Sequence, residues 1–395
     1  MRTPGPSSLG ADARTSRILH VHWSLGIGGA ERALYQLVRA QRDVGADVAV
    51  LIVSEPGLYG ERLAAEGVPI YALGQRNGFE LSHVRAARTL FAQWPIVHFH
   101  GCEPVMMFAA ASTKARTFYT HRAGAFQYRG RRRLRYAIGG HVLRHSFAGV
   151  AGNTRHAADV ASRLFSLRRE EVATVYNGID WMLLRAGRAA AEVRAELCLP
   201  PHALVLGTSG NLRECKRIDM AIRAIDRSSR GVALVVVGDG PERHVLERLV
   251  RDLELADRVR FAGTHANIAD YLQVFDAFVL PSGPEESFGN SAVEALGFGL
   301  PTIVMRDGGG LVEHISDGVT GLVADGIDGL VASIDRLASN PALRRSIGDS
   351  ALLATRRRYT TEAMVAGYNR LYAGNVGETS NSDAPRVLLS AQERD

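Results

Sequence analysis

The sequence has few cysteines and no long apolar run. Only three of its 395 residues are cysteines, Cys102, Cys198 and Cys215, and their wide separation excludes both a disulfide scaffold and the spacing of a metal site. No segment reaches the roughly 18 consecutive apolar residues that a membrane-spanning helix requires. Residues 1–16 lack the apolar core of a secretory signal. We therefore expect a cytoplasmic protein whose thiols stay reduced.

The composition is that of an ordinary globular protein. Hydrophobic residues make up 46% and charged residues 22% of the chain, which excludes wholesale disorder, a collagen-like helix and a coiled coil. The length allows two or three domains. The 41 glycines exceed the average usage of about 7%, which suits a fold with many tight turns. The polar ends, residues 1–16 and 373–395, are predicted to be disordered.

Positive charge is concentrated in one segment. No Asp or Glu occurs between Pro104 and Ala158, whereas the segment contains ten Lys and Arg residues. Removing these ten charges from the net charge of +6 leaves −4 for the rest of the chain. A basic surface of this kind attracts phosphate, acidic glycan, nucleic acid or anionic lipid, although a helix face in contact with solvent alone gives the same pattern. The ten residues are Lys114, Arg116, Arg122, Arg129, Arg131, Arg132, Arg133, Arg135, Arg144 and Arg155.

Short apolar segments alternate with helical segments along the chain. Strands are expected at residues 17–23, 46–53, 68–73, 95–100, 115–121, 173–178, 203–210, 232–238, 259–263, 277–282 and 301–305. Most strands of the second half are apolar throughout, which is typical of parallel strands buried on both faces. The pattern predicts an α/β protein with two doubly wound, Rossmann-like domains, residues 17–185 and 186–372, joined through a linker and short helix. Ligands bind such sheets at the carboxyl ends of the strands, here in the cleft between the domains.

A glycine turn follows the first expected strand and reads Gly26-Ile-Gly28-Gly29-Ala-Glu31. The third glycine of the dinucleotide fingerprint is missing, and no Walker lysine is present, so a nicotinamide-dependent dehydrogenase is disfavoured. Backbone amides at such a turn can approach a diphosphate. The turn is therefore predicted either to open onto the cleft, with Gly28 and Gly29 near an acceptor or phosphate, or to allow close helix packing.

The most informative segment surrounds two glutamates. A buried strand ends at Leu280, and a helix is expected to begin near Gly289 or Asn290, with Glu286 just before it and Glu294 inside it. An anion is favoured at a helix N-terminus, and Glu294 would lie about 7 Å further along the helix axis. A diphosphate at the helix end, with hydroxyl groups for both carboxylates, describes a sugar nucleotide. Two glutamates on an ordinary helix surface would give the same spacing.

The surrounding residues resemble the signature of the family 4 retaining glycosyltransferases of the GT-B architecture. The segment Glu286-Ser-Phe-Gly-Asn-Ser-Ala-Val-Glu294 matches the family's paired glutamates around a Phe-Gly, and Gly299-Leu-Pro follows. Further resemblances come in the family's order, from about Arg17 to about Tyr372. They are Tyr176-Asn-Gly-Ile-Asp180, Gly210-Asn-Leu-Arg-Glu-Cys-Lys216, Val235-Val-Val-Gly238-Asp-Gly240 and Gly308-Gly-Gly-Leu-Val-Glu313.

The resemblance implies an N-terminal acceptor-side domain, a C-terminal domain that binds a nucleotide sugar, and a last helix that can cross back to the first domain. It implies that Glu286 contacts the donor sugar, Glu294 the ribose and Lys216 the diphosphate. Asn211 stands where the family has an arginine, so Arg213 is the candidate replacement. The other implied donor residues are Gly238, Ser287, Phe288 and Gly289. The resemblance also implies transfer with retention, in which positive charge stabilises the leaving diphosphate.

Three histidines lie near the ends of expected strands. His98 and His100 are two residues apart and point to the same face of their strand, and His121 ends another strand. No third ligand follows at short range, so we expect neither a metal site nor a divalent-metal cofactor. The resemblance places His121 at the donor sugar, and His100 is predicted to line the cleft.

Three functions are compatible with these residues. The first is transfer of a sugar from a UDP- or GDP-linked donor to a glycan or lipid-linked saccharide at the cytoplasmic face of a membrane, as in polysaccharide or glycolipid synthesis. The second is glycosylation of a soluble small molecule. The third is a non-enzymatic protein that binds sugar nucleotides, which the presence of Glu286, Glu294, Lys216 and His121 disfavours. No nucleic-acid partner is expected.

The segment from Arg129 to Phe147 carries the membrane hypothesis. If it is helical, Leu134, Ile138 and Val142 form one apolar stripe beside the arginines, a pattern typical of helices that dock on anionic membranes. The basic residues concerned are Arg129, Arg131, Arg132, Arg133 and Arg135. A helix packed on its own sheet, or arginines that bind an acidic acceptor, would explain the pattern equally well. Two internal glycines weaken such a helix by about 1 kcal/mol each, which favours a kink or a break near residues 139–140.

Overall fold

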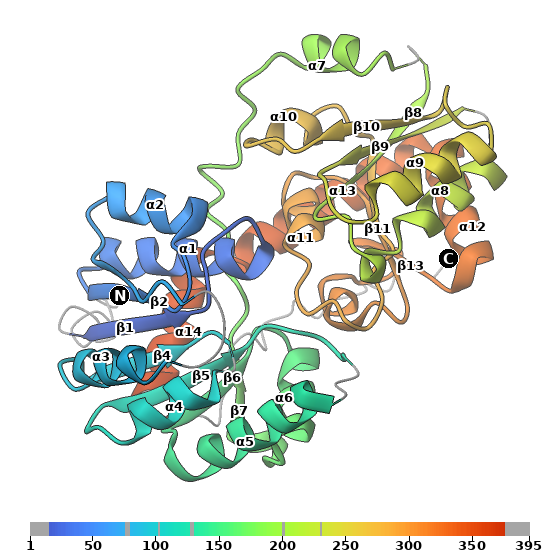
Figure 1. Ribbon diagram of the computed structural model, residues 1–395. Helices are drawn as coiled ribbons and strands as arrows, with labels where there is room; N and C mark the ends of the chain where they lie inside the picture. The colour runs from blue at the N-terminus through green and yellow to red at the C-terminus, as the bar shows by residue number, and fades with distance from the viewer. Residues whose placement is uncertain are drawn as a thin grey trace, which may run out of the picture.

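The computed structural model describes residues 16–75, 80–101, 103–126, 130–199, 202–229 and 231–375, without the side chains of Arg131 and Arg132. The predicted disordered ends lie almost entirely outside these ranges. Within them, the chain forms two parallel sheets, each covered by helices on both faces, which appear as two bodies in Figure 1. The predicted fold is confirmed, whereas the domain boundaries at residues 185 and 186 stay predictions.

The first sheet has seven strands in the order β3-β2-β1-β4-β5-β6-β7. Its strands are β1 (Arg17–His22), β2 (Asp47–Ile52), β3 (Ile70–Ala72), β4 (Ile96–Phe99), β5 (Arg116–His121), β6 (Gly149–Gly152) and β7 (Val172–Thr174). Its helices are α1 (Gly29–Asp43), α2 (Gly57–Ala65), α3 (Leu81–Phe91), α4 (Pro104–Ala111), α5 (Gly130–Ser146) and α6 (Arg155–Phe165), and the short turn η3 (Arg169–Glu171) precedes β7. The strand order reverses between β1 and β4, and in such sheets this point marks the ligand crevice.

The second sheet has six strands in the order β10-β9-β8-β11-β12-β13 and reverses between β8 and β11. Its strands are β8 (Leu204–Ser209), β9 (Val232–Val237), β10 (Val259–Gly263), β11 (Ala277–Leu280), β12 (Thr302–Met305) and β13 (Gly321–Ala324). The other elements are α7 (Ala190–Glu196), η4 (Glu214–Lys216), α8 (Ile218–Arg227), α9 (Arg243–Asp252), α10 (Ala269–Leu272), α11 (Asn290–Gly297), η5 (Gly309–His314), α12 (Gly326–Ser339), α13 (Pro341–Arg358) and α14 (Thr361–Ala373). Every residue of β8, β9, β11 and β12 is buried, as their largely apolar sequences predict.

The last helix returns to the first sheet. Tyr368 and Leu371 of α14 are buried in the same core as Ile18 of β1 and Leu34 of α1. Figure 1 shows α14, in red, beside the blue and cyan elements of the first half. A separate small core of Ile179, Phe288, Val293 and Tyr359 lies where the two halves meet. The site residues are therefore held by elements that are anchored in both halves.

Helix α5 has no break at its two internal glycines. It runs continuously from Gly130 to Ser146, through the position at which a kink or a break was predicted. A Cβ atom at Gly140 would lie 3.2 Å from Phe165 of α6. The missing side chain therefore lets α5 approach α6 closely, and this packing offsets the low helix propensity of glycine.

Candidate active site

The loop between β11 and α11 brings Glu286 against Lys216. The Lys216 ammonium group, at the end of η4, forms an ion pair with the Glu286 carboxylate. Ser282 Oγ lies 3.3 Å from the same carboxylate and donates to it. Both members of the pair are largely buried, at 19% and 14% side-chain exposure. Residues 70 positions apart meet in this way because β8 and β11 are neighbours whose carboxyl ends face the same edge of the sheet.

Two predicted donor residues are glycines for steric reasons. Gly238 has φ +126°, and a Cβ atom there would lie 2.0 Å from the carbonyl oxygen of Gly210. Gly289 caps α11 with φ +67°, and its Cβ atom would lie 2.1 Å from Leu311. Any larger residue would collide with a neighbour and strain the backbone at both positions. The two glycines therefore allow the turns after β9 and β11 to pack closely at the site.

The loop that carries Glu286 contacts the first sheet directly after β5. The backbone N–H of Gly124 donates to the Glu285 carbonyl at 3.0 Å, and that of Ala125 donates to the Pro284 carbonyl at 2.9 Å. The Ser287 hydroxyl donates to the Arg122 carbonyl at 3.1 Å. Ser287 is thus placed beside the residue that follows His121, so the predicted sugar-binding residues of both halves lie close together.

His121 has one nitrogen available for a ligand. Its side chain is 1% exposed, and the Tyr119 hydroxyl lies 3.1 Å from its Nδ1 atom. Its Nε2 atom has no hydrogen-bond partner among the described residues. Burial lowers the pKa of His121 to about 4, with a smaller contribution from His156, so the ring is neutral at physiological pH. A buried, unsatisfied nitrogen beside this loop fits a hydroxyl group of a bound sugar.

Glu294 is occupied by a residue of the other half. Its Oε1 atom lies 2.6 Å from Nη1 of Arg32 on α1, and its side chain is 4% exposed. Burial raises the pKa of Glu294, and the nearby Arg32 opposes that shift. The predicted cleft residues Gly28 and Gly29 begin α1 at this contact, and Asn290 Nδ2 donates to the Gly29 carbonyl at 2.8 Å. The glycine turn therefore packs against α11.

Three predicted donor residues do not converge on the Glu286 carboxylate through their side chains. Asn211 and Arg213 are exposed, and Arg213 lines a groove of about 380 Å³ that also includes residues of α8 and α9. The Phe288 ring lies in the core between the halves, and its carbonyl accepts from His314 Nε2 at 2.7 Å. A contact between Phe288 and a donor would therefore involve its backbone.

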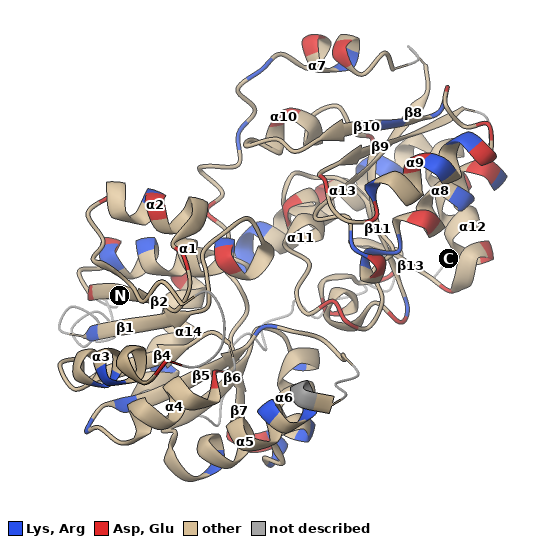
Figure 2. Cartoon of the chain, viewed as in Figure 1, with Lys and Arg blue, Asp and Glu red and all other residues tan. Residues whose placement is uncertain are grey.

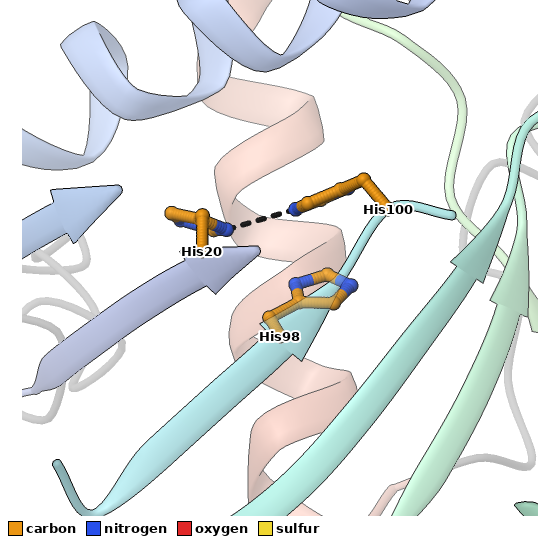
Figure 3. A group of neighbouring side chains, drawn as sticks. All are labelled: His20, His98 and His100. Carbon is orange, nitrogen blue, oxygen red and sulfur yellow. Dashed lines mark hydrogen bonds between the residues drawn. The ribbon is translucent and has the colours of Figure 1, made fainter. Parts of the chain in front are cut away.

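His100 belongs to a buried histidine cluster that the sequence did not predict. His20, His98 and His100 lie together at the carboxyl end of the first sheet, with all their nearest ring nitrogens within 4.8 Å of one another (Figure 3). The missing third histidine, His20, comes from β1, about 80 residues away in the sequence, so no short-range spacing could reveal it. The cluster joins β1 and β4, the two strands between which the strand order of the sheet reverses.

The hydrogen bonds of this cluster engage every ring nitrogen. His98 contacts the hydroxyls of Tyr372 and Thr120 at 2.7 and 2.8 Å. Arg122 Nε lies 3.2 Å from His100 Nδ1, and because a guanidinium group has no acceptor, this nitrogen must accept. His100 Nε2–H then donates to His20 Nδ1 at 2.8 Å, and His20 Nε2–H donates to Gln41 at 2.7 Å. A metal ion bound here would have to displace these hydrogen bonds and would lie beside the Arg122 guanidinium. We therefore assign a structural role to the histidine cluster.

Arg122 connects this cluster to the second half. Its guanidinium also donates to Asn177 Oδ1 at 2.7 Å and to the Tyr368 hydroxyl at 3.1 Å. Asn177 Nδ2 in turn donates to Asn290 Oδ1 at 3.1 Å, at the start of α11. The sequence singled out Arg122 only as one of ten basic residues. Its partners are distant in the sequence, so its position could not be predicted.

A second contact between the halves centres on Glu313 of η5. Its carboxylate accepts from the backbone N–H groups of Arg155 and His156, at 3.0 and 2.6 Å, where α6 begins. The Tyr176 hydroxyl donates to it at 2.8 Å. A carboxylate is favoured at a helix N-terminus, so Glu313 holds α6 against the Gly-Gly loop. The sequence placed Glu313 in a motif without assigning it this contact.

Comparisons with known proteins find glycosyltransferases. Residues 27–181 match the model named Glycosyltransferase Family 4, and residues 191–352 match the model named Glycosyl transferases group 1. The chain is 29% identical to the lipopolysaccharide core biosynthesis glycosyltransferase LpsD of Rhizobium meliloti, over 92% of this chain and 99% of that protein. It is 27% identical to LpsE of the same organism, over 90% and 99%.

Solved structures show the same fold. The structure of HepE from Anabaena in complex with UDP superposes with a TM-score of 0.80 at 20% identity, over 90% of this chain and 99% of that chain. The glycosyltransferase WaaG, described as involved in lipopolysaccharide biosynthesis, gives a TM-score of 0.70 at 15% identity, over 92% and 100%. The fold and the site define a glycosyltransferase of the GT-B architecture. The chain belongs to the family 4 glycosyltransferases.

Proposed function

We propose that the protein transfers a sugar from a UDP- or GDP-linked donor to a hydroxyl group of a glycan or lipid-linked saccharide, with retention of anomeric configuration. The observation that carries the proposal is the meeting of Lys216 and Glu286 at the carboxyl end of the second sheet, beside the start of α11. The relatives named for lipopolysaccharide core biosynthesis support the acceptor class. The HepE structures with UDP and with UDP-glucose support the donor class.

In this proposal each site residue has one role. Lys216 stabilises the negative charge that develops on the leaving diphosphate. Glu286 binds hydroxyl groups of the donor sugar, Glu294 binds the ribose, and His121 Nε2 makes a hydrogen bond to a hydroxyl group near the reacting carbon. Glu286 and Glu294 are bound by different cations, Lys216 and Arg32. With these separate roles on the donor, they do not flank one bond as the carboxylate pair of glycoside hydrolysis does.

The proposed reaction needs no divalent metal. A metal in phosphoryl chemistry neutralises charge on the leaving group, and Lys216 supplies a positive charge at this place. We therefore expect transfer to continue after chelation.

The acceptor side offers a surface for an anionic membrane, and we place the protein in the cytoplasm at such a surface. Phe108 of α4 and Leu134 and Ile138 of α5 are exposed, at 68%, 61% and 49%, whereas Val142 is buried. Only part of the expected stripe therefore packs inside. No acidic residue occurs from α4 through β6, which Figure 2 shows as blue segments without red on α5.

The basic residues of this surface differ in their surroundings. Arg133 is exposed, and Arg135 forms an ion pair with Glu103. Arg129 and the side chains of Arg131 and Arg132 lie outside the described residues. Within the described ranges, no helix combines the length and apolar character that crossing a bilayer demands. Association would therefore be peripheral, with about 1 kcal/mol for each arginine near an anionic surface.

The donor class is tested by thermal shift with a panel of UDP- and GDP-sugars. A specific donor raises the melting temperature because it binds the folded state alone, and product analysis with that donor then establishes turnover and anomeric configuration. A donor that binds without any turnover or hydrolysis would favour the non-enzymatic alternative. Inversion of configuration would refute the retaining mechanism.

The acceptor surface is tested by replacing Arg131, Arg132, Arg133 and Arg135 together with serine. Membrane docking predicts lost binding to phosphatidylglycerol vesicles with normal turnover of a soluble acceptor. A raised acceptor KM without lipid would instead indicate that these arginines bind an acidic acceptor. Unchanged vesicle binding and kinetics would identify a face that only contacts solvent and would favour a soluble acceptor.

A further inference from the structure

The ion pair between Arg32 and Glu294 joins the two halves at the residue assigned to the donor ribose. Arg32 is the fourth residue of α1, and Glu294 belongs to α11, 262 positions later. The Glu294 side chain is almost completely buried, at 4% exposure, whereas the Arg32 side chain is 31% exposed. The Arg32 side chain thus keeps some contact with solvent while its guanidinium pairs with the buried carboxylate.

Neighbouring contacts hold α1 over this carboxylate. Asn290 Nδ2 donates to the Gly29 carbonyl at 2.8 Å, and a Cβ atom at Gly29 would lie 3.3 Å from that nitrogen. Asn290 is itself fixed by Asn177, whose amide donates to it at 3.1 Å. The first turns of α1 and α11 therefore lie against each other, and the Glu294 carboxylate is covered by residues of the first half.

A ribose needs the same carboxylate. Its two adjacent hydroxyl groups would donate hydrogen bonds to the oxygens of Glu294, and Oε1 already accepts from Arg32 at 2.6 Å. Because the carboxylate is buried, a ribose can reach it only when the covering residues move away. Water can solvate the Arg32 guanidinium after it leaves Glu294, because the side chain already extends to the surface.

From these contacts we propose that Arg32 determines donor affinity. In the free protein its guanidinium occupies the ribose-binding carboxylate of Glu294, and the donor binds by exchanging two ribose hydroxyl groups for this guanidinium. The inference rests on the proposed role of Glu294. It adds a residue of the acceptor-side domain to donor recognition, and it makes the apparent affinity depend on the fraction of molecules in which Glu294 is free.

The test is the dissociation constant of UDP and of GDP, measured by titration calorimetry on the full chain. Arg32→Ala should tighten binding of the preferred nucleotide by about fivefold or more, the lower end of typical coupling between linked equilibria. Arg32→Lys keeps the positive charge but loses the planar guanidinium, so its dissociation constant should lie between those of the original protein and Arg32→Ala. Arg42→Ala is the matched control, because Arg42 lies on the same helix and binds the Glu66 carbonyl at 2.7 Å, away from Glu294.

A double-mutant cycle separates exchange from a structural role. In a Glu294→Gln background, which weakens nucleotide binding if the ribose role is correct, Arg32→Ala should have no further effect. Should Arg32→Ala prove poorly folded, Arg32→Gln removes the charge with less loss of packing and carries the same expectation.

Weaker or unchanged nucleotide binding in folded Arg32→Ala and Arg32→Gln would overturn the exchange. Removing a residue that competes with the ribose tightens binding, whereas removing a residue that only supports the site does not. Failure of the original protein to bind either nucleotide, or an unchanged dissociation constant in Glu294→Gln, would overturn the proposed donor site itself and the inference with it.

Discussion

The two sheets present different kinds of surface to the site. In the second sheet, β9 and β11 are apolar throughout, and the polar site residues lie in the loops that follow the strands. In the first sheet, polar residues such as His20, His98 and Thr120 lie within the strands and are fully buried. A site formed by loop residues can be recognised from short sequence motifs. A polar network inside a sheet cannot, because it depends on which strands are neighbours.

The largest expected effect concerns the loop site of the second sheet. Lys216→Ala should lower kcat by about a hundredfold to a thousandfold, because removal of one charged stabiliser of a developing anion costs about 3–4 kcal/mol. Glu286→Ala should also lower kcat strongly, because it removes the proposed ligand of the donor sugar and the partner of Lys216. Steady-state kinetics measure the loss, and unchanged melting temperatures show that the fold is intact. Glu285→Ala is the matched control, since Glu285 is the neighbouring carboxylate and Lys216 pairs with Glu286. Near-normal turnover in either site variant would remove the basis of the assignment.

The pH dependence of stability tests the buried histidines of the first sheet. Burial lowers the pKa of His20 and of His121 to about 4, against 6.5 for an ordinary histidine. Below pH 6.5 the unfolded chain binds protons that the folded protein excludes. Stability is therefore fully present above pH 6.5 and falls progressively down to pH 4, by up to about 3 kcal/mol for each histidine.

Urea unfolding at pH 7.0, 5.5 and 4.5 measures this loss as a falling midpoint. His314 lies in the second half with a pKa of about 3, also because of burial, so His314→Asn compares the two regions. His20→Asn should flatten the profile between pH 6.5 and 4. A profile in His20→Asn as steep as that of the original protein would contradict the assigned neutral state of His20.

Arg122 should matter for stability more than the other basic residues of its segment. Arg122→Met removes charged donors from His100, Asn177 and Tyr368 and leaves buried acceptors unsatisfied. We expect a loss of about 2–4 kcal/mol, because an unsatisfied buried group costs about 1–3 kcal/mol. Arg133→Ala, an exposed residue of the same segment, should change stability by less than about 0.5 kcal/mol. Equal midpoints for both variants in urea would show that the network adds nothing to the fold.

The smallest expected effect is that of chelation. Transfer rates measured with and without EDTA should agree, because in the proposed reaction Lys216 supplies the positive charge for the leaving diphosphate. Loss of transfer in EDTA, restored by magnesium or manganese, would show that the site requires a metal. The leaving diphosphate at the second sheet would then be stabilised by a metal ion as well as by side chains.

Prediction from the sequence succeeded where the signal was local. The apolar segments indicated the strands of both sheets except β6 and β13, two strands of four residues that begin with glycine. The start of α11 at Asn290 agrees with the expected start near Gly289 or Asn290. The segment around Glu286 pointed to the family because its residues are consecutive. Leu134 and Ile138 show the limit of this approach, since periodicity placed them on one stripe with Val142 but could not say which of them would be exposed.

By itself, the sequence determined the two-domain α/β fold, the family and the identity of the donor-side candidates, because periodicity and short motifs are properties of neighbouring residues. Only the tertiary structure decided that Lys216 meets Glu286, that Arg32 covers Glu294 and that His20 joins His98 and His100. These contacts join residues between 70 and 262 positions apart. Strand order and the packing of one half on the other create them, and neither leaves a trace in the local sequence.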